Sequence, residues 1–151
     1  MRTLPADPGT KILRGFVQNR GPLLDRIDMH IEVPAVAFRE LSGDAHGTAS
    51  SQMRAEVAAA RRIQAERFCG TKVRYNGDMS HRMVRRFCAL DDEGRNLLRA
   101  AMTELGLSAR AHDKVLRTAR TIADLDSSES IRPAHLNEAI NYRMLDRQLW
   151  T

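Results

Sequence analysis

Arg110 stands in a sequence context that could bind a phosphate group. Ser108 predicts the N-cap of a helix, because its hydroxyl can accept from the unpaired amides of a first turn, and no glycine or proline follows as far as Leu125. The helix dipole disfavours a cation in the first turn by roughly 0.3–1 kcal/mol, yet no acidic residue occurs there before Asp113. Unpaired amides beside an arginine suit an anion such as phosphate. From this stretch alone, a solvated surface arginine is the simpler interpretation.

Residues 51–86 form a second candidate site, because the excess positive charge of the chain is concentrated there. The formal net charge is +5, and this block holds nine basic and three acidic residues while the rest of the chain is nearly balanced. Such an excess favours binding of nucleic acid or another polyanion through neutralisation of phosphates. A solubilising surface explains any single arginine equally well. The candidate nucleic-acid contacts are Arg54, Arg61, Arg62, Arg74, Arg82, Arg85 and Arg86.

No complete catalytic set can be assembled from this sequence. It contains no GxxxxGK[ST] phosphate loop, no acidic pair after a strand for magnesium, no HExxH and no GxSxG. Cys69 and Cys88 lack metal-ligand spacing, so no metal site is predicted, and both cysteines are expected to be reduced, with Cys88 in the core. The chain alone is therefore not expected to hydrolyse a nucleotide.

Arg26 is a further arginine in a context that suits phosphate chemistry. It directly precedes an alternating apolar segment, and arginines placed at such ends can stabilise a phosphate during its transfer. The alternative is a local ion pair with Asp25 or Asp28.

Composition indicates what kind of domain must position these side chains. The chain has 151 residues, of which 42% are hydrophobic and 5% aromatic, which suits one core of packed helices. We find neither a membrane-length apolar run nor the apolar block of a signal peptide, so we expect a cytoplasmic protein.

The N-terminal third predicts one β-strand. Ile27, Met29, Ile31 and Val33 alternate with polar residues until Pro34, the period of a half-buried strand. One strand cannot satisfy its own ladder groups, so its partners must come from elsewhere. We therefore expect a fragment of a larger domain, with residues 1–48 as the end of a core and its linker.

Residues 49–151 predict a bundle of about five helices. The expected helices begin or end at Ser, Asp, Gly or Pro, and all but the first, which is rich in alanine and arginine and only weakly amphipathic, carry apolar residues at three- and four-residue spacing. They run from Ser50 or Ser51 to about Phe68, from about Asp78 to Cys88, from Asp91 or Asp92 to Gly106, from Ser108 to Leu125, and from Pro133 through Ile140. The predicted fold class is thus all-α, a small helical bundle preceded by an orphan strand.

Four motifs in this order carry a resemblance to a known family. They are the segments Gly21–Pro34 (GPLLDRIDMHIEVP), Gly106–Leu125, Ile131–Ile140 (IRPAHLNEAI) and Tyr142–Arg147 (YRMLDR). Together they resemble the C-terminal part of the magnesium chelatase-related AAA+ ATPases of the YifB/ComM group, over about residues 20–148. The resemblance implies that the strand closes the edge of a nucleotide-binding sheet and that the helical bundle is the lid over ATP.

The resemblance also assigns roles to the two arginines. Arg26 resembles the arginine finger that reaches the γ-phosphate bound by a neighbouring subunit, and is the expected catalytic residue. Arg110 resembles the sensor-2 arginine that touches ATP from the lid of its own subunit. The family uses ATP with magnesium, and its ComM-like members are hexameric motors that move DNA branches.

The expected function is accordingly that of a lid fragment of an ATPase with ATP-sensing arginines and DNA or subunit contacts. The family places the phosphate loop and most of the sheet upstream of residue 20, so we expect neither tight ATP binding nor activity from this chain alone. One alternative is a stand-alone helical module that binds nucleic acid or protein. Another is the ATPase subunit of an enzyme that inserts metal into porphyrins.

Overall fold

The structure, a computed structural model, describes residues 27–31, 33 and 47–143. As predicted, the described part of the chain is an all-α bundle of five α-helices, with one short 3-10 helix. The helices are α4 (Ser50–Arg67), α5 (His81–Phe87), α6 (Asp92–Glu104), α7 (Ala109–Leu125) and α8 (Pro133–Asn141), with the 3-10 helix η1 (Asn76–Asp78) between α4 and α5.

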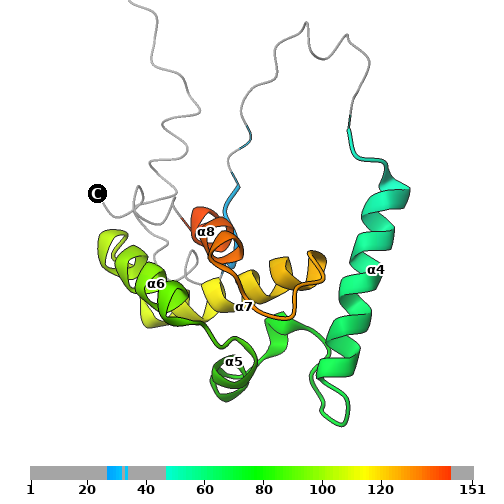
Figure 1. Ribbon diagram of the computed structural model, residues 1–151, viewed down its shortest axis with the longest axis horizontal. Coiled ribbons are helices and arrows are strands. Elements are labelled where there is room, and N and C mark those ends of the chain that lie inside the picture. The colour runs from blue at the N-terminus through cyan, green and yellow to red at the C-terminus, as the bar shows by residue number, and fades with distance from the viewer. Residues whose placement is uncertain (1–26, 32, 34–46, 144–151) are drawn as a thin grey trace, which may run out of the picture.

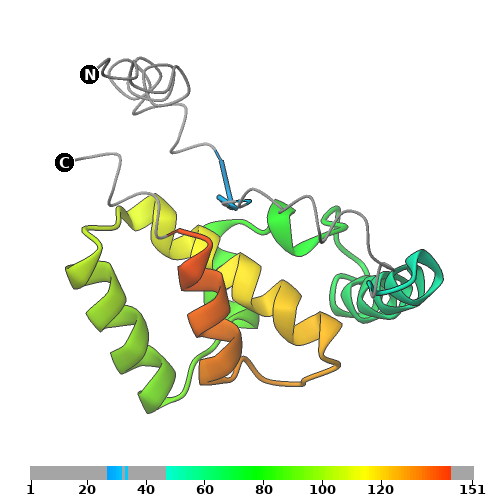
Figure 2. The same cartoon turned by 90° about the horizontal axis from the view of Figure 1, so that it is seen from above.

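The central helix of the bundle is α7 (Figures 1 and 2). It contacts α4, η1, α5 and α8, and α6 packs against α8. Val115, Ala119 and Ala123 of α7 are completely buried, and Leu136 and Ala139 of α8 pack in the same core. Small side chains on α7 let α8 approach closely, and the burial follows the predicted spacing. The apolar stripe predicted for this helix is therefore confirmed.

Several predicted helix boundaries are confirmed by their caps. The Ser108 hydroxyl accepts from the Ala111 amide at 3.2 Å, and the Asp91 carboxylate accepts from the Gly94 amide at 2.7 Å. Gly106 follows α6 with a φ of 61°, a left-handed conformation that glycine adopts without strain. These local signals fix where α6 and α7 begin and end.

The predicted cap of the first helix and the predicted start of the second are wrong. The N-cap of α4 is Ala49, without a side-chain cap, so Ser50 is already helical. The second helix begins at His81 rather than near Asp78, because Ser80 provides the cap and residues 76–78 form η1 instead. From the sequence alone, Asp78 and Ser80 could each cap the second helix. Buried Asn76 of η1 donates to Asp124, and this contact favours the 3-10 helix at residues 76–78 with α5 starting after Ser80.

The predicted strand 27–33 forms no β-ladder in the described residues 27–31 and 33. No second strand is present in the described part of the chain to pair with it. The segment instead lies against α7 and the end of α8, where the His30 amide donates to the Tyr142 carbonyl at 2.8 Å. Lys114 and Arg143 both donate to the Ile27 carbonyl. These contacts satisfy backbone groups that a sheet would otherwise satisfy.

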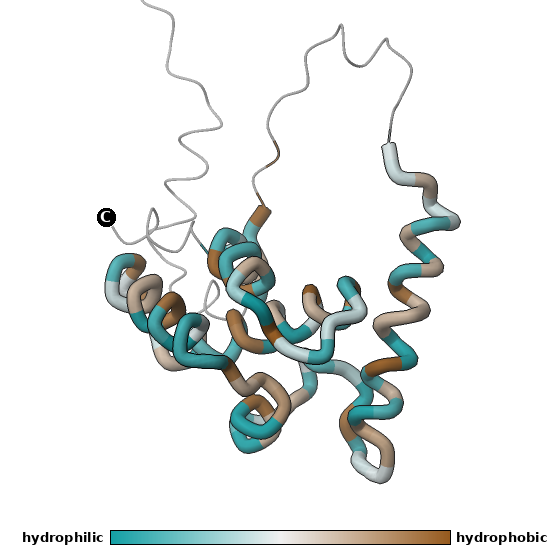
Figure 3. The backbone as a smooth tube through the Cα atoms, viewed as in Figure 1, coloured by the Kyte–Doolittle hydropathy of each residue, from teal (hydrophilic) through white to brown (hydrophobic). Residues whose placement is uncertain are grey.

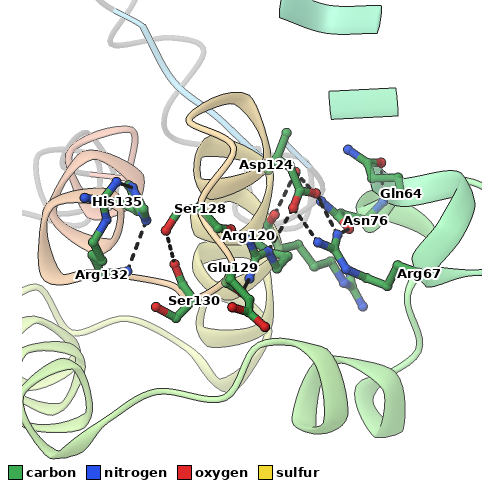
Figure 4. A network of polar contacts seen from close by, with 12 residues as sticks. Gln64, Arg67, Asn76, Arg120, Asp124, Ser128, Glu129, Ser130, Arg132 and His135 are labelled. Atoms are coloured by element: carbon green, nitrogen blue, oxygen red, sulfur yellow. Dashed lines mark hydrogen bonds and ion pairs between the residues drawn. The ribbon is translucent and has the colours of Figure 1, made fainter. Parts of the chain in front are cut away.

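A buried carboxylate, that of Asp124, joins α4, η1 and α7 (Figure 4). Its side chain is fully buried and accepts from Arg67 at 2.6 Å, from the Asn76 amide group at 2.8 Å and from Arg120 Nε at 3.1 Å. The Asn76 backbone amide in turn donates to the Gln64 side chain at 3.1 Å. One acidic side chain therefore fixes the end of α4 and the loop after it onto α7.

Arg120 is held in the same network and is only 3% exposed. Its two terminal nitrogens donate to the Glu129 and Ser128 carbonyls at 2.9 and 2.6 Å, which ties the turn after α7 to the helix. Burial lowers the pKa of Arg120, whereas the Asp124 carboxylate acts to raise it. Because an arginine pKa starts so high, the guanidinium stays charged at neutral pH and needs this counter-ion.

The two cysteines are free, as expected. Cys69 is exposed, whereas Cys88 packs in the core, where burial raises its thiol pKa to about 12. Cys88 is therefore a protonated core side chain at neutral pH, as predicted. Within the described residues, no helix is both long and apolar enough to cross a membrane.

The buried network predicts a large loss of stability for Asp124→Asn. The asparagine keeps the shape but leaves two arginines without a buried counter-ion, a change that costs about 3–5 kcal/mol. Urea unfolding followed by circular dichroism measures it. The matched control is Asp92→Asn, which removes an exposed carboxylate paired with Arg95 and is expected to cost about 1 kcal/mol or less. Equal losses in the two variants would show that the network does not hold the bundle together.

Candidate functional site

Arg110 lies in the first turn of α7 and is exposed. This turn contains no acidic residue. Among the described residues, Arg110 makes no hydrogen bond or ion pair. The first amides of a helix have no intrahelical acceptor, so the Ala109 and Arg110 amides accompany the guanidinium as donors. The predicted anion-binding arrangement is therefore geometrically available at this end of α7.

Asp113 is the nearest acidic residue on α7, and it is already occupied by two histidines. At three residues from Arg110 it could form an ion pair along the helix. Its carboxylate instead contacts His81 Nδ1 at 2.8 Å and His112 Nδ1 at 3.2 Å. Burial acts to raise the pKa of Asp113, but its hydrogen bonds with His81 and then His112 outweigh that effect and lower it. The arrangement leaves the Arg110 guanidinium for a ligand.

Lys114, one turn after Arg110, connects α7 to the segment that follows Arg26. Its ammonium group lies 3.0 Å from the Asp28 carboxylate and 3.0 Å from the Ile27 carbonyl, and its side chain is only 12% exposed. Arg26 itself lies outside the described residues. Its covalent neighbour Ile27 is nevertheless held by Lys114 and Arg143, so the described chain begins beside the helix that carries Arg110.

A cavity of about 330 Å³ opens beside this contact but does not include Arg110. It lies between α7, α8 and the 28–29 segment, and Met29, Ile122 and Tyr142 are among its lining residues. Its volume is at the lower end for small-ligand sites. Of the two cations that line it, Lys114 is paired with Asp28 and Arg117 donates to the Met79 carbonyl, so the anion site at Arg110 and this cavity are separate features.

The seven predicted nucleic-acid arginines are all exposed. Three belong to α4, three to α5 and one to the loop between them, and none of the seven forms an ion pair with another described residue. Arg67, which contributes to the charge of the same block, is not available for a ligand because it pairs with Asp124. Figure 3 shows hydrophilic and hydrophobic residues interleaved along α4, and the α4 residues 50–58 are all exposed.

Sequence reasoning missed two side chains at these sites. Lys114 is four residues after Arg110, a spacing that places both on one face of α7. Tyr75, which is 43% exposed, stacks with Arg61, whose guanidinium carbon lies 4.1 Å from the ring centroid. An aromatic residue directly after Arg74 in a basic block is the signal that could have identified Tyr75.

No metal centre is present among the residues that the structure describes. No three His, Cys, Asp or Glu side chains in this part of the chain are grouped so that they could hold a metal ion. His81 and His112 form a hydrogen-bonded cluster with Asp113.

Comparisons with known proteins define the family. A family model described as "Magnesium chelatase, subunit ChlI C-terminal" matches residues 47–143, which include the whole helical bundle. Competence protein ComM from Haemophilus influenzae is 38% identical over 141 residues, covering 92% of this chain and 27% of the relative. The YifB proteins of Escherichia coli and Salmonella typhimurium are 38% and 35% identical over 138 residues, covering 91% of this chain and 26% of each relative.

The chain thus spans only about a quarter of the length of these curated relatives. The match to the family model covers well over half of the chain, and the relatives extend it to nearly all of it. The chain therefore belongs to the magnesium chelatase ChlI C-terminal family, as a member related to the ComM and YifB proteins.

Proposed function

We propose that the helical bundle is the lid of a AAA+ ATPase and that Arg110 contacts ATP from it. The observation that carries this proposal is the exposed Arg110 in the first turn of a 17-residue helix, without a partner among the described residues. The family supports it, because the resemblance assigns this position to the sensor-2 arginine. The alternative of a merely solvated arginine gives no reason for placing a cation at the positive end of the helix.

The chemistry follows from the donors that meet at this end of α7. A guanidinium can bind two phosphate oxygens at once, and the neighbouring amides add donors in fixed directions. ATP, bound with magnesium, supplies the phosphate that is transferred. This chain would supply only the lid side of the site, because its sequence has no phosphate loop and no magnesium-binding acidic pair.

Arg26 is proposed as the arginine finger that acts on the nucleotide of a neighbouring subunit. Its own position is outside the described residues, so the support comes from the resemblance and from the residue after it. Lys114 and Arg143 hold the Ile27 carbonyl against α7 and α8. The residue that follows the proposed finger would therefore move together with the lid helix.

For the whole protein we propose a ring-forming, ComM-like motor that moves DNA branches, with the exposed arginines of residues 51–86 as DNA contacts. The name of the Haemophilus relative, competence protein ComM, supports this choice. The description of the family model favours the metal-insertion alternative instead. Genomic neighbours separate the two: competence or recombination genes support the motor, and pigment-synthesis genes support the chelatase.

In a full-length relative, replacing the arginine aligned with Arg110 by alanine should weaken ATP binding about tenfold or more. A hydrogen bond to a charged group contributes about 1.5–3 kcal/mol, which corresponds to that range. Nucleotide titration by calorimetry measures the affinity for ATP, and steady-state assays measure ATP turnover. Lysine at the same position is the control, because it restores the charge without the two-pronged geometry and should recover part of the affinity. Unchanged ATP affinity in the alanine variant would refute the sensor role.

The alanine variant at the position aligned with Arg26 should behave differently. It should bind ATP nearly normally but turn over roughly 10³-fold more slowly, since a finger acts mainly on the charge of the transferred phosphate. Mixing two kinds of defective subunit tests directly whether the arginine acts across the subunit interface. This variant, mixed with a subunit that keeps the arginine but has a defective phosphate loop, should recover some ATPase activity. If mixed rings form and no ratio recovers activity, Arg26 does not act across the subunit interface.

A further inference from the structure

Tyr75 is an exposed aromatic side chain in the most basic part of the chain. It is 43% exposed, and the Arg61 guanidinium lies over its ring at 4.1 Å from the centroid. Such a cation–π contact holds the long arginine side chain in one place. Tyr75 and Arg61 therefore form a small, exposed and positively charged surface at the junction of α4 and the following loop.

This surface is held on a rigid base. Asn76, the next residue, is only 1% exposed and donates to both Asp124 and Thr121. Its backbone amide donates to Gln64 on α4. The backbone beside Tyr75 is thus fixed before any ligand arrives, which lowers the entropic cost of binding.

Positive charge continues along α4 from the stacked pair. Arg54 is seven residues before Arg61, so the two lie on one face of the helix about 10.5 Å apart along its axis. Arg62 and Arg74 are exposed next to Arg61 and Tyr75 in sequence.

The carboxylates of this region leave the charge available. They belong to Glu56, Glu66 and Asp78, and Glu56 accepts from Gln52 at 3.0 Å. Among the described residues, none of the three forms an ion pair with Arg61.

We propose that Tyr75 and Arg61 form a stacking platform for a base of a single-stranded polynucleotide, with Arg54, Arg62 and Arg74 neutralising its phosphates. Phosphate neutralisation alone explains exposed arginines but gives no use for an exposed ring. Bases of a duplex are stacked on one another, whereas those of a single strand offer a free face to an aromatic side chain. The inference rests on the proposed DNA-motor function and names the form of DNA that this surface takes.

The test measures binding of the full 151-residue chain to a fluorescent dT20 strand and to a 20-bp duplex by anisotropy at several salt concentrations. Tyr75→Leu should weaken dT20 binding roughly 5- to 100-fold, the effect of losing one stacked base, and change duplex binding less than twofold. Tyr75→Phe keeps the ring and should bind like the parent chain. A circular dichroism melt of each variant establishes that it is folded.

Arg62→Gln is the matched control for charge. It should weaken both ligands alike and reduce the slope of log affinity against log salt by about one, while Tyr75→Leu leaves this slope unchanged. A parallel titration with rU20 distinguishes the two sources of single strands: equal affinity identifies a platform indifferent to the sugar, and tighter dT20 binding identifies one that prefers DNA.

The outcomes separate the platform from the function on which it rests. If dT20 and the duplex bind in a salt-dependent way and Tyr75→Leu changes neither, the platform is refuted and the DNA contact stands. If the chain binds neither ligand at low salt, both the platform and the DNA contact are refuted. Should Tyr75→Leu fail to fold, a folded Arg61→Gln variant that loses more affinity for dT20 than for the duplex supports the platform, and equal losses for the two ligands overturn it.

Discussion

The buried carboxylate of Asp124 is the interaction on which the arrangement of this bundle depends. Two arginines and one amide converge on it from three elements, Arg67 from α4, Asn76 from η1 and Arg120 from α7 itself. Buried charges are tolerated only when they are paired and hydrogen-bonded, so these three donors are held around the Asp124 carboxylate in a single geometry. That geometry sets the direction of α4, and through Asn76 it fixes the loop that presents Tyr75.

The same helix serves the core and the candidate site. Ala111, Val115 and Ala119 anchor one face of α7 in the core, so its exposed first turn has a defined position. Lys114, one turn further along the helix, contacts the 27–28 segment. The proposed nucleotide contact, the chain that follows the proposed finger and the buried network are therefore all joined through α7, which is a suitable design for a lid that responds to a ligand.

Local signals in the sequence predicted most of the fold, whereas contacts between distant residues could not be predicted. Ser108, Asp91 and Gly106 act through their immediate neighbours, so their roles were readable from the sequence. Arg67 was assigned only to the basic block, because its partner is 57 residues away. The alternation at 27–33 predicted a half-buried strand, but Ile27, Met29, Ile31 and Val33 are exposed and the described residues contain no second strand with which this segment could pair. Arg110 was found because its context is local, and Tyr75 was missed because Arg61 comes from another element.

The central claim is that the first turn of α7 binds phosphate through Arg110, and an NMR titration of the isotopically labelled chain tests it most directly. Sodium tripolyphosphate and ATP would each be added to the full chain, with sodium chloride of matched ionic strength as the reference. The account predicts saturable shifts at the Ala109 and Arg110 amides and at the Arg110 guanidinium, and their loss in Arg110→Ala. Shifts confined to the arginines of α4 and α5, with none at the start of α7, would contradict it.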